Sequence, residues 1–581
     1  MWRRTLGVCG LLGAAALAQA QPVVFAPLAP AETEAEQRAV RTSPSLRIGH
    51  SAHTIAYHIL LRSGDRLGGH TFGMLVDQRG KPLGRVSHRP DFTSLIPAGD
   101  ALFSLTHFEE RPGAVYLTEL AQDPEHGYLQ ARSTRPLDLS GVGGIYAPCA
   151  GSVTPWYSHL GGEEYEPDAR AFEAAVEHDS AIEGSFRAMA RYFDVDPKQA
   201  STEELAEVLQ PYRYGFVTEI TLDNSADQVA VEVEKHYAMG RASIEVARVM
   251  PDGRSVYISD DASNGGLYLF VADNPGDLSA GRLFAMAWRQ KTSRPPTADL
   301  EWVDLGHASD GDIEEAIDQG GTFSDLFSVR DPDHCPSRYR LINTRFGREC
   351  LRLRRGMGEL ASRLETRRYA ALQGATTEWR KAEGLTVDTA AKQLFLASSE
   401  HAQGMLDGQS PFDDDGRNDM RIAANPCGGV WQFALGWDEA VGSGWVAQSA
   451  RTALVGVAAG EGRNQCAVDA IANPDNLAAI DGHHTVLIAE DSGRGHQNDA
   501  LWAYDWRQRR LTRVQTSPFG AEITSPYVYP NLNGRAYITS VIQHPYAESD
   551  RDRLRPGSGD ERAYVGYIGP LPALAVEGDH P

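Results

Sequence analysis

The sequence predicts an all-β protein, a β-propeller whose helical insertions decorate one face. Short runs of β-branched and aromatic residues recur beside turn signals, as in a protein built from many short strands. Many of these runs end in acidic or polar residues, which is the layout of a propeller blade. Their spacing is irregular, so the repeat is degenerate. A β-sandwich is the alternative, but acidic strand ends and long helical insertions favour the propeller.

The chain begins with a predicted signal peptide, residues 1–20. A short basic start precedes an apolar run from Leu6 to Leu17 and the small-x-small pattern Ala18-Gln19-Ala20. We therefore expect a periplasmic or secreted protein. Arg3-Arg4 leaves a twin-arginine route open beside the general secretory one, although two arginines are ordinary in such a segment. The apolar run is too short for a stable membrane anchor, and no later stretch is long enough.

After the signal peptide we predict an N-terminal segment, residues 21–48, and one catalytic propeller domain, residues 49–581. The expected strand regions are 101–110, 114–121, 214–222, 252–273, 391–400, 483–506 and 533–545. Helical composition covers Asp168–Phe193, Ser201–Leu209 and Met357–Tyr369, and the second stretch opens with the capping-box pattern Ser-Thr-Glu-Glu. The helical insertions are thus expected near 168–210 and 357–370.

The charge balance excludes one class of partner. The chain has 55 Lys and Arg against 78 Asp and Glu, a net charge of -23, whereas a nucleic-acid binder needs the opposite sign. Such an acidic excess suits an extracytoplasmic protein or one that gathers hard cations, and a soluble acidic surface explains it equally well.

Five cysteines remain once Cys9 leaves with the signal peptide, so one of them is odd. In an oxidising compartment the natural pairs are Cys335 with Cys350 and Cys427 with Cys466. Cys149 is left as the free thiol, either a buried inert side chain or a ligand.

The free thiol lies in a segment suited to holding an ion. Cys149 stands in Pro148–Trp156, and a glycine-rich stretch with two carboxylates, Leu160–Glu164, follows it. Thiolate with carboxylate suits a transition metal better than calcium. Asp413–Asp419 resembles an isolated calcium loop, but a solvated turn is the favoured interpretation. Further acids that a propeller channel could collect, each by itself more typical of a solvated surface, are Glu219, Glu245, Asp260, Asp261, Glu383, Asp475, Asp491, Asp499 and Glu522.

Taken together, several segments resemble the PhoX-type calcium-dependent alkaline phosphatases. They run in family order from Cys149 to Pro545: PCAGSVTPW, LGGEE, YGFVTEI, MGRASIEVA, YISDDA, EWRKAEGLTVD, ANPDNLA, EDSGRGHQND and GAEITSPYVYPNLNGRAYITSVIQHP. The resemblance implies a six-bladed propeller that holds Fe3+ and Ca2+ and hydrolyses phosphate monoesters.

The resemblance also implies roles for single residues. Cys149 matches the iron-binding cysteine, and the metal-binding glutamates are matched by Glu164, Glu245, Glu383 and Glu522. Asp475 and Asp491 are further metal-ligand candidates.

Two departures from the family pattern concern the site. Ile244 stands where the family has His before Glu245, and Lys381-Ala382-Glu383 replaces Arg-Pro-Glu. The cation that holds a phosphate oxygen is therefore Lys381 in register, or Arg380 displaced by one residue. In an extended backbone Lys381 shares a face with Glu383, so we favour Lys381.

The electrostatics expected of such an acidic site agree with this resemblance. Carboxylates would repel a phosphate dianion unless multivalent cations reverse the local sign, and such cations also supply the catalysis. No G-x-S-x-G nucleophile motif is present. We expect a monomer that acts on small phosphate esters. The alternatives are a calcium-dependent propeller lactonase and a non-catalytic, calcium-stabilised binding propeller.

Overall fold

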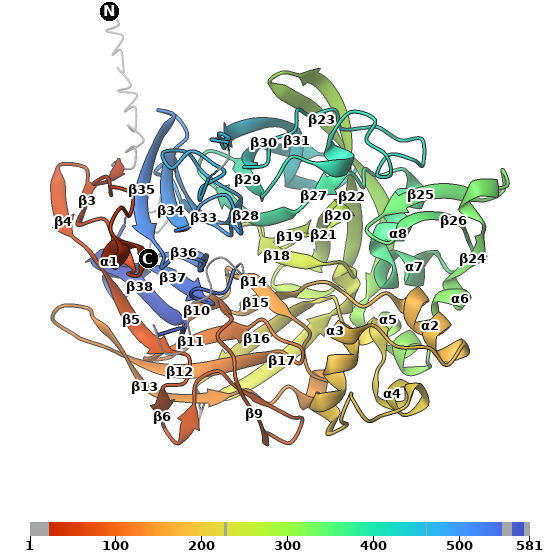
Figure 1. Cartoon of the computed structure of the whole chain (residues 1–581), viewed down its shortest axis with the longest axis horizontal. Helices are drawn as coiled ribbons and strands as arrows, with labels where there is room; N and C mark the ends of the chain where they lie inside the picture. The colour runs from red at the N-terminus through yellow and green to blue at the C-terminus, as the bar shows by residue number, and fades with distance from the viewer. Residues whose placement is uncertain (1–21, 226–228, 461, 549–559, 575–581) are drawn as a thin grey trace, which may run out of the picture.

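The computed structural model describes residues 22–225, 229–460, 462–548 and 560–574, so the predicted signal peptide lies outside the described residues. The described chain is all-β, as predicted, with helices only in connections between strands (Figure 1). None of its helices is long and apolar enough to cross a membrane.

Strands that follow one another in sequence pair in antiparallel sheets. The first large sheet has the order β10 (Pro90–Ala98), β11 (Ala101–Phe108), β12 (Ala114–Gln122) and β13 (Leu129–Pro136). The second has the order β14 (Pro148–Val153), β15 (His159–Glu163), β16 (Val217–Asp223) and β17 (Ala230–His236).

The middle of the chain forms a nine-stranded sheet in which two such meanders join edge to edge. One meander contains β18 (Ile244–Val249), β19 (Ser255–Asp260), β21 (Leu267–Asn274), β22 (Asp277–Ser293) and β23 (Pro296–Ser309). The other contains β28 (Ala382–Asp388), β29 (Gln393–Ser398), β30 (Gly429–Asp438) and β31 (Ser443–Val455). The pairing of β23 with β31 joins the two.

The last two large sheets each recruit a strand from near the N-terminus. One contains β32 (Pro474–Ile480), β33 (Thr485–Glu490), β34 (Ala500–Asp505) and β35 (Arg510–Thr516), with β2 (Arg41–Thr42) at its edge. The other contains β36 (Glu522–Leu532), β37 (Arg535–Gln543) and β38 (Tyr564–Pro572), and β5 (Ala56–Arg62) completes it. The two ends of the chain are therefore tied together by strand pairing.

The first strands of these meanders pack against one another in a closed circuit. β10 contacts β14, β14 contacts β18, and the contacts continue through β28, β32 and β36 back to β10. The first or second residues of all six strands line one cavity, so these strands begin at the same end of the circuit.

Apart from α1 (Glu34–Gln37), the α-helices of the described residues lie in two insertions, which Figure 1 shows gathered on one side of the sheets. Between β15 and β16 lie α2 (Ala169–Glu177), α3 (Gly184–Arg187) and α4 (Thr202–Val208). Between β23 and β28 lie α5 (Asp310–Asp318), α6 (Phe323–Leu326), α7 (Gly358–Leu364), α8 (Thr366–Gln373) and a small sheet of β24 (Phe327–Arg330), β25 (Arg340–Thr344) and β26 (Gly347–Leu353).

The helix predictions are confirmed with changed bounds. Asp168 and Ser201 cap α2 and α4, and Ser201 forms the predicted capping box. The stretch Asp168–Phe193 is not continuous, because the chain leaves the helix after Glu177 and resumes at Gly184. The sequence prediction missed α5 and α6.

The remaining short elements lie mostly near the N-terminus. They are β1 (Val23–Phe25), α1 (Glu34–Gln37), β3 (Ser45–Ile48), β4 (Ser51–Thr54), β6 (Arg66–Leu67), β7 (His70–Thr71), β8 (Met74–Val76), β9 (Pro82–Val86), β20 (Ser263–Gly265) and β27 (Trp379–Arg380). The β3–β4 hairpin spans residue 48, where the sequence analysis ends its N-terminal segment.

Apolar side chains fill the spaces between neighbouring sheets. In the largest cluster Trp288, Trp379 and Trp431 are fully buried and pack edge to face, with ring centroids 5.4 to 5.8 Å apart. Both predicted disulfides are present, Cys335–Cys350 and Cys427–Cys466. Cys149 is free, as the cysteine count predicted, and it is buried.

Candidate metal centre

The six strands of the closed circuit, here called the central strands, are β10, β14, β18, β28, β32 and β36. Each of them has one acidic or thiol side chain at its first or second residue. In five of them the strand pairing shifts register at this residue, a β-bulge that re-aims the side chain. All six side chains are therefore delivered to the same end of the circuit. The residues are Asp91, Cys149, Glu245, Glu383, Asp475 and Glu522.

These six side chains line one cavity of about 310 Å³. Glu164, directly after β15, and Asp491, directly after β33, also line it. The structure thus brings together all seven residues predicted from the sequence as metal ligands. The other lining residues are Arg89, Glu109, Arg111, Tyr165, Asp261, Lys381, His544, Ala547 and Glu548.

The seven predicted ligands form three overlapping groups whose ligand atoms lie within 4.8 Å of one another. They are Cys149 with Glu164 and Glu245, Glu245 with Glu383 and Asp475, and Asp475 with Asp491 and Glu522. The Cys149 Sγ lies 3.3 Å from Glu245 Oε2. Glu245 belongs to the first and second groups and Asp475 to the second and third, so the three candidate ion sites are adjacent to one another.

The cavity holds more negative groups than its cations compensate. Ten carboxylic acids line it against Arg89, Arg111 and Lys381. Burial, and then the neighbouring carboxylates, raise the pKa of Glu383 to about 7 and that of Glu245 well above its usual range. Burial followed by the same repulsion raises the pKa of the Cys149 thiol. Bound multivalent cations would relieve this repulsion, so the donor set fits hard and borderline metal ions.

Lys381 faces the cavity and Arg380 does not. Lys381 Nζ lies 2.9 Å from Glu383 Oε1 and 3.2 Å from Asp261 Oδ2. Burial would lower the pKa of Lys381, but the two carboxylates outweigh it and raise the pKa well above its usual range. Arg380 Nε instead donates to Glu400 Oε1 at 2.6 Å. The two side chains therefore point in different directions, as expected. The expectation assumed an extended backbone, however, and Lys381 has a left-handed backbone with φ 51°.

Three of the acids considered from the sequence do not line the cavity, and each has a partner elsewhere. Glu219 Oε2 lies 2.7 Å from His236 Nε2. Asp260 accepts a hydrogen bond of 2.8 Å from Arg367 Nε, and Asp499 accepts one of 2.9 Å from the Ser492 amide.

Two further sequence candidates also lie elsewhere. Glu163, adjacent to Glu164, pairs with the buried Lys235 at 2.9 Å. Asp413–Asp419 forms a turn in which Asp413 accepts a hydrogen bond of 2.7 Å from the Gln409 amide. This turn contributes to none of the metal-capable groups of the described residues.

His236 forms a charged bridge at some distance from this cavity. Its ring nitrogens lie 2.7 Å from Glu219 Oε2 and 3.1 Å from Asp310 Oδ2. Burial would lower the pKa of His236, but the hydrogen bonds and charges of the two carboxylates raise it to about 10. The bridge ties β16 and β17 to the start of α5.

Sequence reasoning missed several lining residues. Asp91 had a detectable signal, since Pro90-Asp91 opens β10 as Pro148-Cys149 opens β14 and Pro474-Asp475 opens β32. Tyr165, whose hydroxyl donates to Asp261 Oδ2 at 2.8 Å, follows Glu164 in a turn. No sequence pattern distinguishes Arg89, Glu109 or Arg111 from surface residues.

The two glycines before Glu163 allow close packing behind the centre. A Cβ on Gly162 would lie 2.2 Å from the Ile244 carbonyl oxygen, and one on Gly161 2.1 Å from the His107 ring. The His107 Nδ1 in turn donates to the Cys149 carbonyl oxygen at 2.8 Å. The Gly-Gly pair therefore lets β15 approach β18 and the residues that support Cys149.

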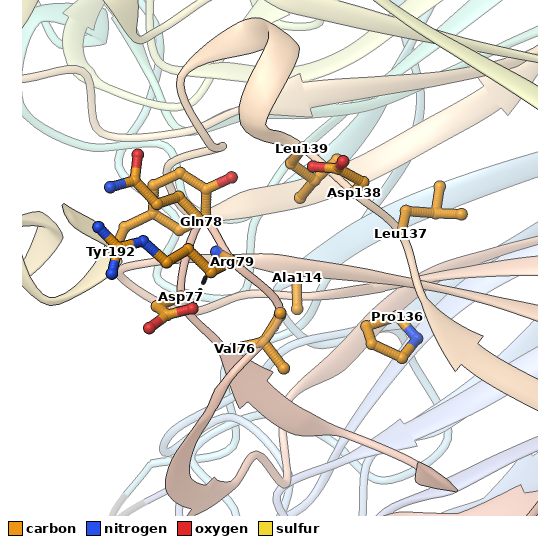
Figure 2. A pocket seen from close by; sticks show the side chains of 12 residues that line it. Val76, Asp77, Gln78, Arg79, Ala114, Pro136, Leu137, Asp138, Leu139 and Tyr192 are labelled. Atoms are coloured by element: carbon orange, nitrogen blue, oxygen red, sulfur yellow. Dashed lines mark hydrogen bonds between the residues drawn. The ribbon is translucent and has the colours of Figure 1, made fainter. Parts of the chain in front are cut away.

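A second cavity, of about 230 Å³, offers no comparable chemistry. Figure 2 shows Asp77, Gln78, Arg79 and Tyr192 on one side of it, across from Asp138 and Leu139. Asp77 Oδ1 already accepts hydrogen bonds from the Arg79 and Lys81 amides.

Several solved structures are similar to this chain. Pseudomonas fluorescens PhoX, in complex with vanadate, a transition state analogue, matches with TM-score 0.61 and 17% identity over 97% of this chain and 100% of that one. A putative 6-phosphogluconolactonase from Bacteroides uniformis has TM-score 0.27 and 14% identity over 75% of this chain and 89% of that one. Trypanosoma rangeli sialidase has TM-score 0.29 and 9% identity over 88% of this chain and 58% of that one.

Sequence comparison supplies the family. No curated protein matches the chain significantly. The family model for alkaline phosphatase PhoX matches residues 118–545, which is most of the chain and includes all seven predicted ligands. The fold and the acidic cavity agree with this match, and the chain therefore belongs to the PhoX family of alkaline phosphatases.

Proposed function

We propose that this phosphatase is exported and hydrolyses phosphate monoesters at a ferric and calcium centre held in the acidic cavity. The observation that supports this most strongly is the convergence of Cys149 and six carboxylates in three adjacent groups. A thiolate suits iron better than calcium, and the two purely carboxylate groups suit calcium. The predicted signal peptide supports export.

We also infer that the fold is a six-bladed propeller with the centre at one mouth of its channel. The circuit of six first strands supports this, since each leads an antiparallel meander. Pairing of β5 with β38 would close the last blade.

In this function the acidic residues hold the cations and Lys381 binds the substrate. The cations, when bound, would polarise the phosphoryl oxygens and supply a nucleophile at neutral pH. Lys381 donates to a phosphate oxygen, while Asp261 and Glu383 hold its ammonium in place. Tyr165 in turn orients Asp261 through its hydroxyl. Asp91, which accepts from Thr524 Oγ1 at 2.6 Å and lies 3.5 Å from Cys149 Sγ, completes the ring of acids.

Elemental analysis tests this proposal. The purified native protein should contain iron and calcium, and its aryl phosphatase activity should be lost on chelation and return when both metals are restored. A metal-free preparation with full activity would overturn the assignment.

A further inference from the structure

The three cations that line the cavity differ in what they already bind. Lys381 is held by two carboxylates at 2.9 and 3.2 Å. Arg89 has one long contact, 3.8 Å from Nη1 to Glu109 Oε2, and its side chain is 48% exposed. Arg111 forms no ion pair with a carboxylate of the described residues, and its buried Nε has no hydrogen-bond partner there.

Aromatic rings hold Arg111 in place. Its guanidinium carbon lies 5.1 Å from the ring centroid of Tyr146 and 5.6 Å from that of Tyr165. Tyr165 is fixed by its hydrogen bond to Asp261 and by Arg345, which lies 5.8 Å from the ring centroid. Cation–π contact uses the face of a guanidinium and leaves its edge free for a bidentate oxyanion contact. Arg111 is therefore a pre-organised anion-binding group.

Arg111 and Arg89 lie on a different sheet from Lys381. Arg89 precedes β10 and Arg111 follows β11, so both lie in connections at the edge of the first sheet, with Glu109 between them in sequence. Lys381 lies between β27 and β28. When the phosphate of a substrate contacts Lys381, Arg89 and Arg111 therefore remain available in the same cavity for another anionic group. The cavity, about 310 Å³, is at the small end of ligand sites.

We propose that Arg111, assisted by Arg89, binds a second anionic group on the leaving part of the substrate. The preferred substrates are then small phosphate monoesters that also carry a carboxylate or a second phosphate. This inference rests on the proposed monoester hydrolysis at the same site. An oxyanion on the leaving group would fill the hydrogen-bonding edge of Arg111 and offset its positive charge.

Two matched substrates test the preference. Glycerol 3-phosphate and 3-phosphoglycerate share a skeleton and differ only in a hydroxymethyl group against a carboxylate. We expect kcat/KM to be about 10- to 100-fold higher for 3-phosphoglycerate, the range of a charge-assisted contact. Glycerol 1,3-bisphosphate, in a third arm, shows whether a second phosphate is preferred to a carboxylate.

Variants then assign the preference to Arg111. In Arg111→Gln the ratio of the two kcat/KM values should fall to near one, and Arg111→Lys should restore part of it. The matched control is Arg248→Gln, because the Arg248 guanidinium carbon also lies 5.1 Å from a tyrosine ring centroid, that of Tyr527, and Arg248 does not line the cavity. It should keep the wild-type ratio. Melting temperature and metal content are measured on each variant, and Arg89→Gln replaces Arg111→Gln if the latter does not fold.

The outcomes separate this inference from the proposed function. Equal kcat/KM for both esters in the wild type, or an unchanged ratio in a folded, metal-loaded Arg111→Gln, would overturn the inference alone. Hydrolysis of neither ester, with aryl phosphates also untouched, would overturn monoester hydrolysis itself.

Discussion

Replacing Lys381 by methionine tests the cation at the centre of the proposed mechanism. Methionine keeps most of the length of the side chain and removes the charge that now lies between Asp261 and Glu383. A charge-assisted contact made mainly in the transition state is worth about 100- to 1,000-fold in turnover. We expect kcat for an aryl phosphate to fall by about 100-fold, with a smaller change in KM.

Arg380→Gln is the matched control, since the neighbouring Arg380 forms a partly exposed pair with Glu400 and does not line the cavity. Such pairs contribute about 0 to 1 kcal/mol to stability, so turnover should stay close to that of the wild type. Lys381→Arg should recover part of the activity.

Metal content must be measured for each of these variants, because Lys381 also neutralises two carboxylates. Near-normal turnover in Lys381→Met with a collapse in Arg380→Gln would refute the choice of residue. A loss of turnover that only follows a loss of metal would refute direct contact with phosphate.

Three further predictions concern the centre and its support. Cys149→Ser should remove the visible absorption expected of a ferric thiolate and lower the iron content, and full iron with unchanged colour would contradict its role as a ligand. Gly162→Ala should destabilise the protein by about 1 to 3 kcal/mol in denaturant unfolding, because its Cβ would meet backbone, whereas Gly311→Ala, with nothing within 4 Å of its Cβ, should not. Folding raises the pKa of His236 from 6.5 to about 10. The protonated ring therefore contributes its full stabilisation below pH 6.5 and loses it as the pH rises toward 10. Unfolding free energy should therefore fall as pH rises from 7 through 10, and His236→Asn should flatten this dependence.

The sequence predicted which acidic and thiol residues are candidate ligands better than it predicted which other residues line the cavity. Cys149 and the six carboxylates were found because the motifs that carry the resemblance to the family are local in sequence. Asp91, Arg89 and Arg111 were not, although they line the same cavity. Strand pairing and the packing of β10 against β14 and β36 place these residues at the site, and neither can be read from a window of sequence.

Local patterns also led to errors where tertiary partners decide the outcome. Asp260 has the strand-end position expected of a ligand and Glu219 lies within β16, but Arg367 binds Asp260 and His236 binds Glu219. A carboxylate at a strand end is equally available to a metal and to a cation on a neighbouring element.

The sequence alone determined the all-β class, the capped helix at Ser201, the odd cysteine and the family, because each rests on residues close together or on an ordered set of motifs. Only the tertiary structure decided which acids share one cavity and that Lys381, not Arg380, faces it. The left-handed backbone at Lys381 and the register shifts of the central strands set those directions. The shifts arise where each of these strands pairs with the next one along the chain, and the backbone beside Lys381 is held by the pairing of Arg380 with the distant Ser263. The charge of the site follows from that convergence, since repulsion between buried carboxylates arises only when folding brings them together.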